Sequence, residues 1–250
     1  MNIVGLVPCA GKGNRLGLPF SKELYPDVYN ETYRPIIIYT IEAMKRAGIN
    51  HIIFTVNPTK IELLKYLGNG KQFGMDFTFV IHPEAKSLPE SLNEAYHLLK
   101  DVHVVFAMPD TVIQPNDFLK KMIKCHLTED SNEVTLGCFK TNKPQKFGMV
   151  DMIGNQVVRI DDKPKHSSLK WMWGAMIWNP SFTGELNNFV IRNNNRENTE
   201  TELKLSDSLQ NLIISNKVGV LKFPQGKYRD LGTYDEIIEW AKAREIPILV

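Results

Sequence analysis

The stretch VGLVPCAGKGNRLGLPFSKELYP, residues 4–26, decides the fold. It begins within an apolar run, Ile3 to Val7, that has the length and composition of a buried strand. A loop rich in glycines and cations follows: Gly11, Gly13, Gly17, Lys12, Arg15 and Lys22. Glycine lets a backbone turn sharply and approach a ligand, and consecutive N–H groups in such a loop bind anions. The stretch therefore predicts a strand that leads into a phosphate-binding loop.

Two common phosphate motifs do not fit this loop. A Walker loop needs four residues between its first glycine and Gly-Lys, but five separate Gly5 from Gly11, and Lys12 is followed by Gly13. The dinucleotide fingerprint needs G-x-G-x-x-G, whereas Gly11, Gly13 and Gly17 are one residue too widely spaced. The glycines alone leave a second interpretation open, a tight connection with solvated charges.

Short apolar runs alternate with helical patterns around this stretch. Strands are expected at 51–56, 77–81 and 102–107, and helices at 35–47, 58–67 and 89–99. Such alternation predicts an α/β fold with a Rossmann-like, doubly wound, mostly parallel sheet. Further strands are expected at 134–139, 148–160 (with a turn at 154–155), 173–178 and 218–223, and helices at 181–192, 202–214 and 233–243. The very polar stretch 192–201 predicts a loop.

Composition excludes several classes of protein. The 250 residues are 43% hydrophobic and 23% charged, and 30 basic against 28 acidic residues give a net charge of +2. This balance argues against a nucleic-acid footprint over the whole surface. The three cysteines form no C-x-x-C pair, and no apolar run is long enough to cross a bilayer. We therefore expect a cytoplasmic protein with neither nucleic acid nor membrane as partner.

The loop resembles the signature of the sugar-1-phosphate nucleotidyltransferases, and in particular of glucose-1-phosphate thymidylyltransferase-like members. That signature is a strand, then Ala-Gly-x-Gly-x-Arg-Leu, then a proline-containing loop that ends in lysine; here it reads Ala10 to Leu16, with Pro19 and Lys22. Further segments resemble family elements in the same order: 108–110 (MPD), 147–150 (FGMV), 161–164 (DDKP), 173–178 (WGAMIW), 202–207 (ELKLSD) and 228–233 (YRDLGT). The resemblance covers almost the whole chain.

The resemblance implies transfer of a nucleotidyl group from an NTP to a sugar 1-phosphate, with Mg²⁺ as cofactor and pyrophosphate as second product. The implied catalytic residues are Arg15 and Lys22. The implied nucleotide-binding residues are Ala10, Gly11, Gly13 and Pro89. The implied substrate-binding residues are Gly148, Asp162, Lys163 and Gly174. The implied metal ligands are Asp110 and Asp230, which suits an ion that takes one or two carboxylates plus phosphates.

We expect one domain over residues 1–250, with a nucleotide-binding part (1–133), a smaller sugar-binding lobe (134–225) and a closing segment (226–250). The chain ends soon after the last expected helix, which predicts no appended acyltransferase or β-helix domain. Homo-oligomerisation is left open. Asp110 and Asp230 are far apart in sequence, and we predict that they face each other across one cleft, because strand ends in such sheets form one face.

Some residues depart from the family pattern. Asn14 stands where Thr or Ser is usual, and Ser21 stands where Pro usually precedes the lysine. The shorter loop is similar to that of the cytidylyltransferase branch of the same fold, and the segment 82–92 lacks a Gly-Leu-Ala or Gly-Thr-Ala run, so the base is undecided. Two alternatives remain: a cytidylyltransferase acting on a non-sugar phosphate, and a non-catalytic homologue that binds a nucleotide sugar. Retained charges such as Lys22 and Asp110 disfavour the second.

Overall fold

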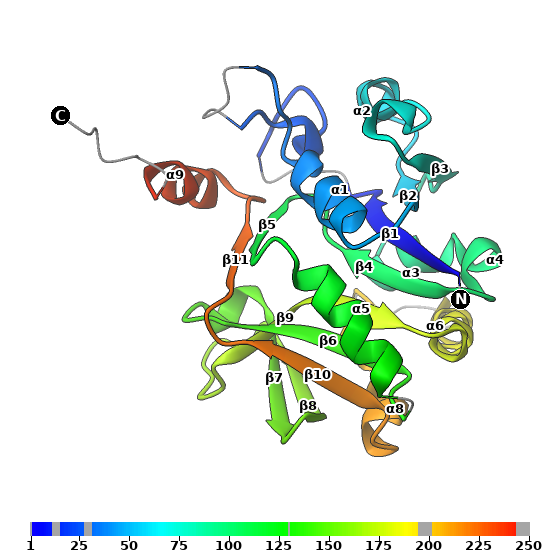
Figure 1. The fold of residues 1–250 in the computed structure, drawn as a ribbon, viewed down its shortest axis with the longest axis vertical. Helices are drawn as coiled ribbons and strands as arrows, with labels where there is room; N and C mark the ends of the chain where they lie inside the picture. Colours follow the sequence, from blue (N-terminus) through cyan, green and yellow to red (C-terminus); the bar gives the residue numbers. More distant parts are fainter. Residues whose placement is uncertain (1, 12–15, 28–31, 130, 195–201, 244–250) are drawn as a thin grey trace.

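The computed structural model describes residues 2–11, 16–27, 32–129, 131–194 and 202–243 (Figure 1). These form one nine-stranded sheet in the order β3-β2-β1-β4-β9-β6-β10-β8-β7, beside a two-stranded sheet, β11-β5. The strands of the large sheet are β1 (Ile3–Cys9), β2 (His51–Val56), β3 (Asp76–Ile81), β4 (His103–Ala107), β6 (Val134–Lys140), β7 (Gly148–Ile153), β8 (Gln156–Asp162), β9 (Trp171–Trp178) and β10 (Val218–Phe223).

The first half of the sheet is parallel, as the sequence predicts. β1 pairs in parallel with β2 on one side and β4 on the other, and β2 pairs in parallel with β3. A helix follows each of β1, β2 and β3 before the next strand, which gives the chain the crossovers that parallel pairing requires. The carboxyl ends of these strands therefore lie along one edge of the sheet.

The second half makes the sheet mixed, so the expected mostly parallel arrangement needs correction there. β9 lies antiparallel between β4 and β6, and β8 lies antiparallel to both β10 and β7. One physical reason is that no α-helix separates β6, β7, β8 and β9 along the chain, so the short connection between β7 and β8 makes these two an antiparallel hairpin. Helices also separate β4 from β9 and β8 from β10, which pair antiparallel, and β6 from β10, which pair in parallel.

Helices cover both faces of the sheet. Alternate residues of β1 enter different core clusters, Val7 and Cys9 on one face and Val4 and Leu6 on the other. The first cluster includes side chains of α1 (Ile37–Arg46), α2 (Ile61–Leu67) and α5 (Phe118–Thr128). The second includes side chains of α3 (Leu88–Asn93), α4 (Tyr96–Leu99), α6 (Pro180–Asn194), α7 (Leu205–Ser208) and α8 (Gln210–Ile214).

Several expected elements differ in detail. The helix expected at 89–99 is two helices, α3 and α4, and the one expected at 202–214 is α7 and α8. Helix α6 continues to Asn194, so the first residues of the expected polar loop are helical, while 195–201 lie outside the described residues. Helix α5 and the short strands β5 (Thr111–Gln114) and β11 (Lys227–Asp230) were not expected.

Helix α9 (Tyr234–Lys242) lies to one side of the large sheet, after β11 (Figure 1). The Thr233 hydroxyl caps its N-terminus by accepting from the backbone N–H of Glu236. Its buried residues Ile237 and Trp240 pack with Leu16 and Leu231 in a third, small core cluster. Burial of this apolar stripe holds α9 against the loops that follow β1 and β11.

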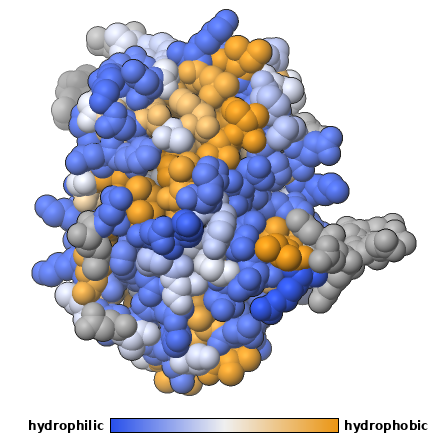
Figure 2. Space-filling view, turned by 90° about the vertical axis from the view of Figure 1, so that its right-hand side faces the viewer, coloured by the Kyte–Doolittle hydropathy of each residue, from blue (hydrophilic) through white to orange (hydrophobic). Residues whose placement is uncertain are grey.

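The surface seen in Figure 2 combines an apolar and a polar region. Apolar side chains gather in its upper part, over α2 and β3, where Ile61 and Ile81 are 56% and 43% exposed. Strand β3 forms that end of the sheet.

Within the described residues, no helix has both the length and the apolar character needed to span a membrane. All three cysteines are free thiols, and Cys9 and Cys138 are buried.

One buried histidine makes stability depend on pH. Burial first, and then nearby His103, lower the pKa of His126 from its ordinary value to about 4, and its Nδ1 lies 2.9 Å from the Thr135 hydroxyl. The folded state therefore binds fewer protons than the unfolded state, so stability present above about pH 6.5 is lost as the pH falls towards 4. Between pH 7 and 4.5, we expect the free energy of unfolding in urea to fall about 2 kcal/mol further in the wild type than in His126→Gln. Equal losses would contradict this assignment.

Candidate active site

A cavity of about 280 Å³ opens at the edge of the sheet where β1 and β4 end. Residues of the parallel half line one side of it, and residues of β7, β8 and β9 line the other. Seven of the residues that the sequence singled out line this one cavity: Lys22, Asp110, Gly148, Asp162, Lys163, Gly174 and Asp230. The fold thus brings together residues that are up to about two hundred positions apart in the chain.

Lys22 and Asp110 form an ion pair inside this cavity. Lys22 belongs to a 3₁₀ turn, Lys22–Leu24, and its Nζ lies 2.5 Å from Oδ2 of Asp110. Their side chains are only 14% and 4% exposed. Burial by itself lowers the pKa of Lys22, but the carboxylates of Asp110, Glu23 and Asp230 raise it more, and the net shift is upward. The ammonium group therefore stays charged in a site with little water.

The residues on either side of Lys22 are both fixed by the segment that begins α2. The backbone N–H and hydroxyl of Ser21 donate to Oε1 of Glu62 at 2.8 and 2.6 Å. Nζ of Lys60 donates to Oε1 of Glu23 at 2.7 Å, in a pair whose side chains are 7% and 1% exposed. These contacts hold the turn, and so they fix the direction in which Lys22 leaves the backbone.

Asp110 and Asp230 lie at the paired ends of the small β5–β11 ribbon. Asp110 directly precedes β5, Asp230 ends β11 opposite Thr111, and the N–H of Leu231 donates to the carbonyl oxygen of Asp110 at 2.9 Å. Both aspartates therefore line the same cavity, and the backbone pairing makes them neighbours at one end of the ribbon; that the two carboxylates face each other across a cleft stays a prediction. The route differs from the expected one, because Asp230 is the last residue of the ribbon strand β11 and does not lie at the end of a strand of the large sheet.

The carboxylates of Asp110 and Asp230 are groups that could hold a magnesium ion if substrate and water completed its coordination. Among the described residues, no group of three or more His, Cys, Asp or Glu side chains could hold a metal ion. Mg²⁺ commonly takes one or two carboxylates and keeps its other positions for phosphate and water, so Asp110 and Asp230 fit such an ion. Burial first, and then the charges of Asp230 and Asp110, raise the pKa of the Tyr228 phenol beside them, which marks the negative potential at this place.

The opposite wall carries the expected sugar-side residues. Gly148, at the start of β7, pairs with Asp162 at the end of β8, and the next residue, Lys163, donates its N–H to the carbonyl oxygen of Phe147 at 3.0 Å. Lys163 has a φ of 46°, a left-handed conformation that is uncommon outside glycine. The turn therefore holds Lys163 at the cavity in a strained conformation, which is a frequent property of functional residues.

Close packing explains the two glycines of this wall. A Cβ atom on Gly148 would lie 2.3 Å from Nε1 of Trp173, and one on Gly174 would lie 2.4 Å from the ring of Tyr228. Neither distance is compatible with a side chain unless the aromatic ring moves. Both glycines therefore shape the cavity by leaving room for aromatic side chains, whatever they contact in a bound substrate.

A family model described as Nucleotidyl transferase matches residues 4–245. The chain belongs to this nucleotidyl transferase family. A glucose-1-phosphate thymidylyltransferase of Streptomyces antibioticus is 22% identical over 94% of the chain and 64% of its own length. A mannose-1-phosphate guanyltransferase of Pichia angusta is 28% identical over 64% of the chain and 44% of its own length. The chain thus spans less than two thirds of these curated relatives.

The solved structure of another protein has the same fold as this nucleotidyl transferase family member. The crystal structure of a UDP-glucose pyrophosphorylase complexed with UDP-glucose superimposes with a TM-score of 0.79 and 18% identity, over 97% of this chain and 98% of that one. At this identity the likeness establishes the mixed α/β architecture with its large sheet.

The structure describes only some of the residues that the sequence predicts to bind the nucleotide. Ala10 is buried and Gly11 exposed directly after β1, at the edge of the sheet where Lys22 and Asp110 meet. Pro89 is buried in the first turn of α3, and it does not line the cavity, whereas its neighbour Leu88 does. Gly13 and Arg15 lie outside the described residues, so their roles stay predictions.

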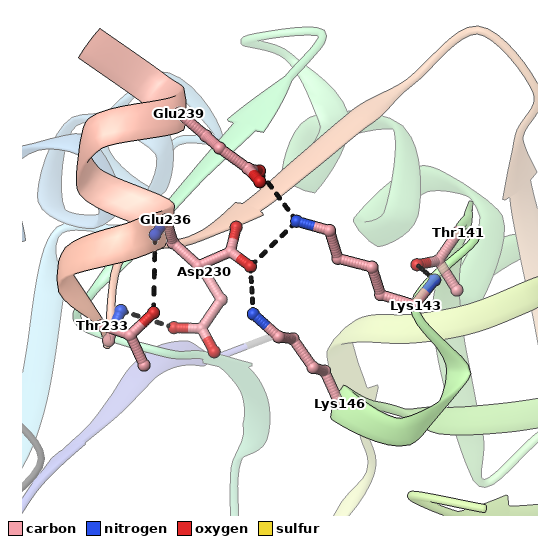
Figure 3. Close-up of polar contacts among 8 residues, drawn as sticks. Thr141, Lys143, Lys146, Asp230, Thr233, Glu236 and Glu239 are labelled. Carbon is pink, nitrogen blue, oxygen red and sulfur yellow. Dashed lines mark hydrogen bonds and ion pairs between the residues drawn. The ribbon is translucent and has the colours of Figure 1, made fainter. Parts of the chain in front are cut away.

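Sequence reasoning missed several residues of the site. Lys146 lines the cavity just before Phe147, and it forms an ion pair with Glu236 of α9, as Figure 3 shows. Tyr228 and Thr111 also line the cavity. The position of Lys146 beside the aromatic-glycine element was a usable signal. Nothing local could have indicated Glu236, which is 90 residues away from its partner.

Proposed function

We propose that this chain transfers a nucleotidyl group from an NTP to a sugar 1-phosphate and releases pyrophosphate. The observation that carries the proposal is the cavity in which Lys22, Asp110 and Asp230 face Gly148, Asp162 and Lys163. One wall offers groups for a triphosphate and its metal, and the other offers a cation and polar groups for a phosphorylated sugar. Family membership and relatives that use sugar 1-phosphates support the same reaction.

The chemistry needs what this cavity offers. An oxygen of the sugar phosphate attacks the α-phosphorus of the NTP, a new P–O bond forms, and the bond to the leaving pyrophosphate breaks. Both reactants are anions, so the rate depends on alignment and on neutralising charge that grows on the phosphate oxygens. A bound Mg²⁺ supplies part of that charge. Such a step requires no side-chain nucleophile.

Each role is assigned to a particular side chain. Lys22 holds the transferring phosphoryl group once substrate displaces its contact with Asp110, and Arg15 is proposed to bind the triphosphate with its guanidinium fork. Asp110 and Asp230 hold the magnesium ion. Lys163 binds the sugar phosphate, and Asp162 accepts from a sugar hydroxyl.

The direct test is pyrophosphate release over a matrix of four NTPs plus dTTP against several sugar 1-phosphates. We expect one combination to give a nucleotide sugar, identified by its mass, and chelation of Mg²⁺ to stop the reaction. Turnover only with CTP and a polyol or amino-alcohol phosphate would favour the cytidylyltransferase alternative. Binding of a nucleotide sugar without any turnover would favour the regulatory alternative.

Replacing Lys163 with Ala is expected to weaken use of the sugar phosphate far more than use of the NTP. Lys163 lines the cavity on the same wall as Asp162, and it directly follows the last residue of β8. Loss of a charge-assisted contact costs roughly 1.5–3 kcal/mol, which corresponds to an increase of about ten- to a hundredfold in the KM for the sugar phosphate. Steady-state kinetics with each substrate varied in turn measures this. A KM that rises only for the NTP would show that the assignment is wrong.

A further inference from the structure

An ion-pair network connects segments on the two walls of the cavity, the wall of Asp110 and Asp230 and the wall of Asp162 and Lys163. The carboxylate of Glu236, in the first turn of α9, accepts from Nζ of Lys146 and, at 3.1 Å, from Nζ of Lys143 (Figure 3). Both lysines belong to the segment 140–147 that leads into β7, so the contact spans 90 residues of chain. The Glu236 side chain is only 13% exposed, whereas the side chains of its partners Lys143 and Lys146 are 33% and 35% exposed.

On the lysine side, the network ends directly at the sugar wall. Lys146 is itself part of the cavity lining and is followed by Phe147 and Gly148. The carbonyl oxygen of Phe147 accepts from the N–H of Lys163, and Gly148 pairs with Asp162. The two residues that follow Lys146 therefore contact Lys163 and Asp162, the proposed ligands of the sugar phosphate and of a sugar hydroxyl, through the backbone.

From Glu236, the network continues along the backbone to Asp230 on the other wall of the cavity. Thr233 caps α9 by accepting from the N–H of Glu236, and the N–H of Gly232 donates to Oδ1 of Asp230 at 2.8 Å. Only five residues separate Asp230 from Glu236 along this ordered segment. Burial raises the pKa of Glu236, but the charges and hydrogen bonds of Lys146 and Lys143 lower it more, so the carboxylate is ionised and the bridge is charged.

We propose that Glu236 is a positioning residue. Through its ion pair with Lys146, it fixes the distance between Asp230 on one wall of the cavity and Lys163 and Asp162 on the other. The proposal rests on the function proposed above, because it assigns Glu236 to the same cavity. Catalysis by alignment is sensitive to displacements of about an ångström, so a residue that touches neither substrate can still control productive binding. Within the part of the chain that the structure describes, the ion-pair partners of the Glu236 side chain are Lys143 and Lys146, not Lys22, Asp162 or Lys163.

The first test compares Glu236→Gln with Glu239→Gln. Glu239 lies on the same helix and pairs with Lys143 at 2.7 Å, but it is 59% exposed and has no contact with Lys146, so it is the matched control. We expect Glu236→Gln to raise the KM for the best sugar 1-phosphate about five- to tenfold and to leave the KM for the NTP within about twofold. Glu239→Gln should change neither. Unchanged constants in both variants, or equal changes in both, would overturn the proposal.

A charge exchange separates positioning from direct substrate contact by Lys146. Lys146→Glu should raise the KM for the sugar phosphate, because it places two carboxylates together. The double variant Lys146→Glu with Glu236→Lys restores an ion pair of reversed polarity and should recover most of that loss. A KM that does not recover, with the thermal midpoint restored, would show that Lys146 acts by touching the substrate and would overturn the role of Glu236.

A third measurement keeps the inference independent of the reaction. Hydrogen exchange of the unliganded protein should become faster in Glu236→Gln over residues 140–148 and 227–233, with β1 to β3 unchanged, and Glu239→Gln should behave as wild type. If the wild type proves inactive with every substrate pair, the proposed function fails, while this exchange pattern still decides whether Glu236 couples the two walls. An exchange profile identical to wild type would overturn the coupling even in an active protein.

Discussion

Asp110→Asn is expected to lower kcat for pyrophosphate release by at least about 10²–10³-fold, the loss typical of one preorganised charge-stabilising group. Two effects act together. Asparagine keeps the shape of the side chain but removes the charge that a magnesium ion would need, and it also leaves the buried ammonium of Lys22 without the carboxylate at 2.5 Å. Since Asp110 is 3% exposed, water replaces neither interaction well.

The control for this variant is Asp117→Asn. Asp117 also pairs with a lysine, Lys121, at 3.0 Å, but both side chains are about half exposed, and such surface pairs contribute little. We expect kcat and the urea midpoint of Asp117→Asn to equal those of the wild type. Far-UV circular dichroism of Asp110→Asn should show an intact fold. Turnover near the wild-type value in that folded variant would rule out the metal and phosphate roles assigned to Asp110 and Lys22.

Lys60→Met is expected to lower the free energy of unfolding by about 3–5 kcal/mol, the usual cost of breaking a buried ion pair on one side only. Its partner Glu23 is 1% exposed, and among the described residues Oε2 of Glu23 has no hydrogen-bond partner. Methionine fills the space of the lysine stem but leaves the Glu23 carboxylate buried without its counter-charge. Urea unfolding at pH 7 measures the loss.

Two further variants make this stability prediction specific. The double variant Lys60→Met with Glu23→Gln removes both charges and should recover most of the loss, because a neutral pair has no buried charge to compensate. Lys71→Met breaks a pair with Asp76 whose side chains are more than 60% exposed, and it should cost less than about 1 kcal/mol. A loss in Lys60→Met as small as that in Lys71→Met would contradict the burial argument.

The elements that the sequence predicts well are those with a strong apolar signal. β2 lies where the run His51 to Val56 places it, and β1, β3, β4 and α1 lie within two residues of their expected ends. The short strands β5 and β11 were missed because each has four residues of mixed polarity, and their pairing depends on a partner more than a hundred positions away. Propensity carries little information about a strand whose stability comes from tertiary contacts.

The site shows the same division between local and distant information. Residues at the ends of strands or turns, such as Asp110 and Lys163, were identified from their motifs and lie at the cavity. The residues that hold the turn around Lys22, Glu62 and Lys60, were not accessible to sequence reasoning, because they carry no motif and act through side-chain contacts between distant segments. The same is true of Glu236, for which a positioning role is proposed. A sequence names candidate reactive groups more readily than the groups that orient them.

The position of β9 has a consequence for synthesis of the protein. Strand β9 pairs with β4 on one side and β6 on the other, so the parallel half of the sheet has an open edge until residue 178 is made. Val104, Val105 and Phe106 lie on that edge strand and are fully buried in the folded molecule. A chain emerging from the ribosome therefore exposes an apolar strand edge while some seventy further residues are added, a state prone to association with other chains. Fragments cut near residue 133 should need a chaperone or a solubilising fusion, and co-expression with the missing half should rescue them.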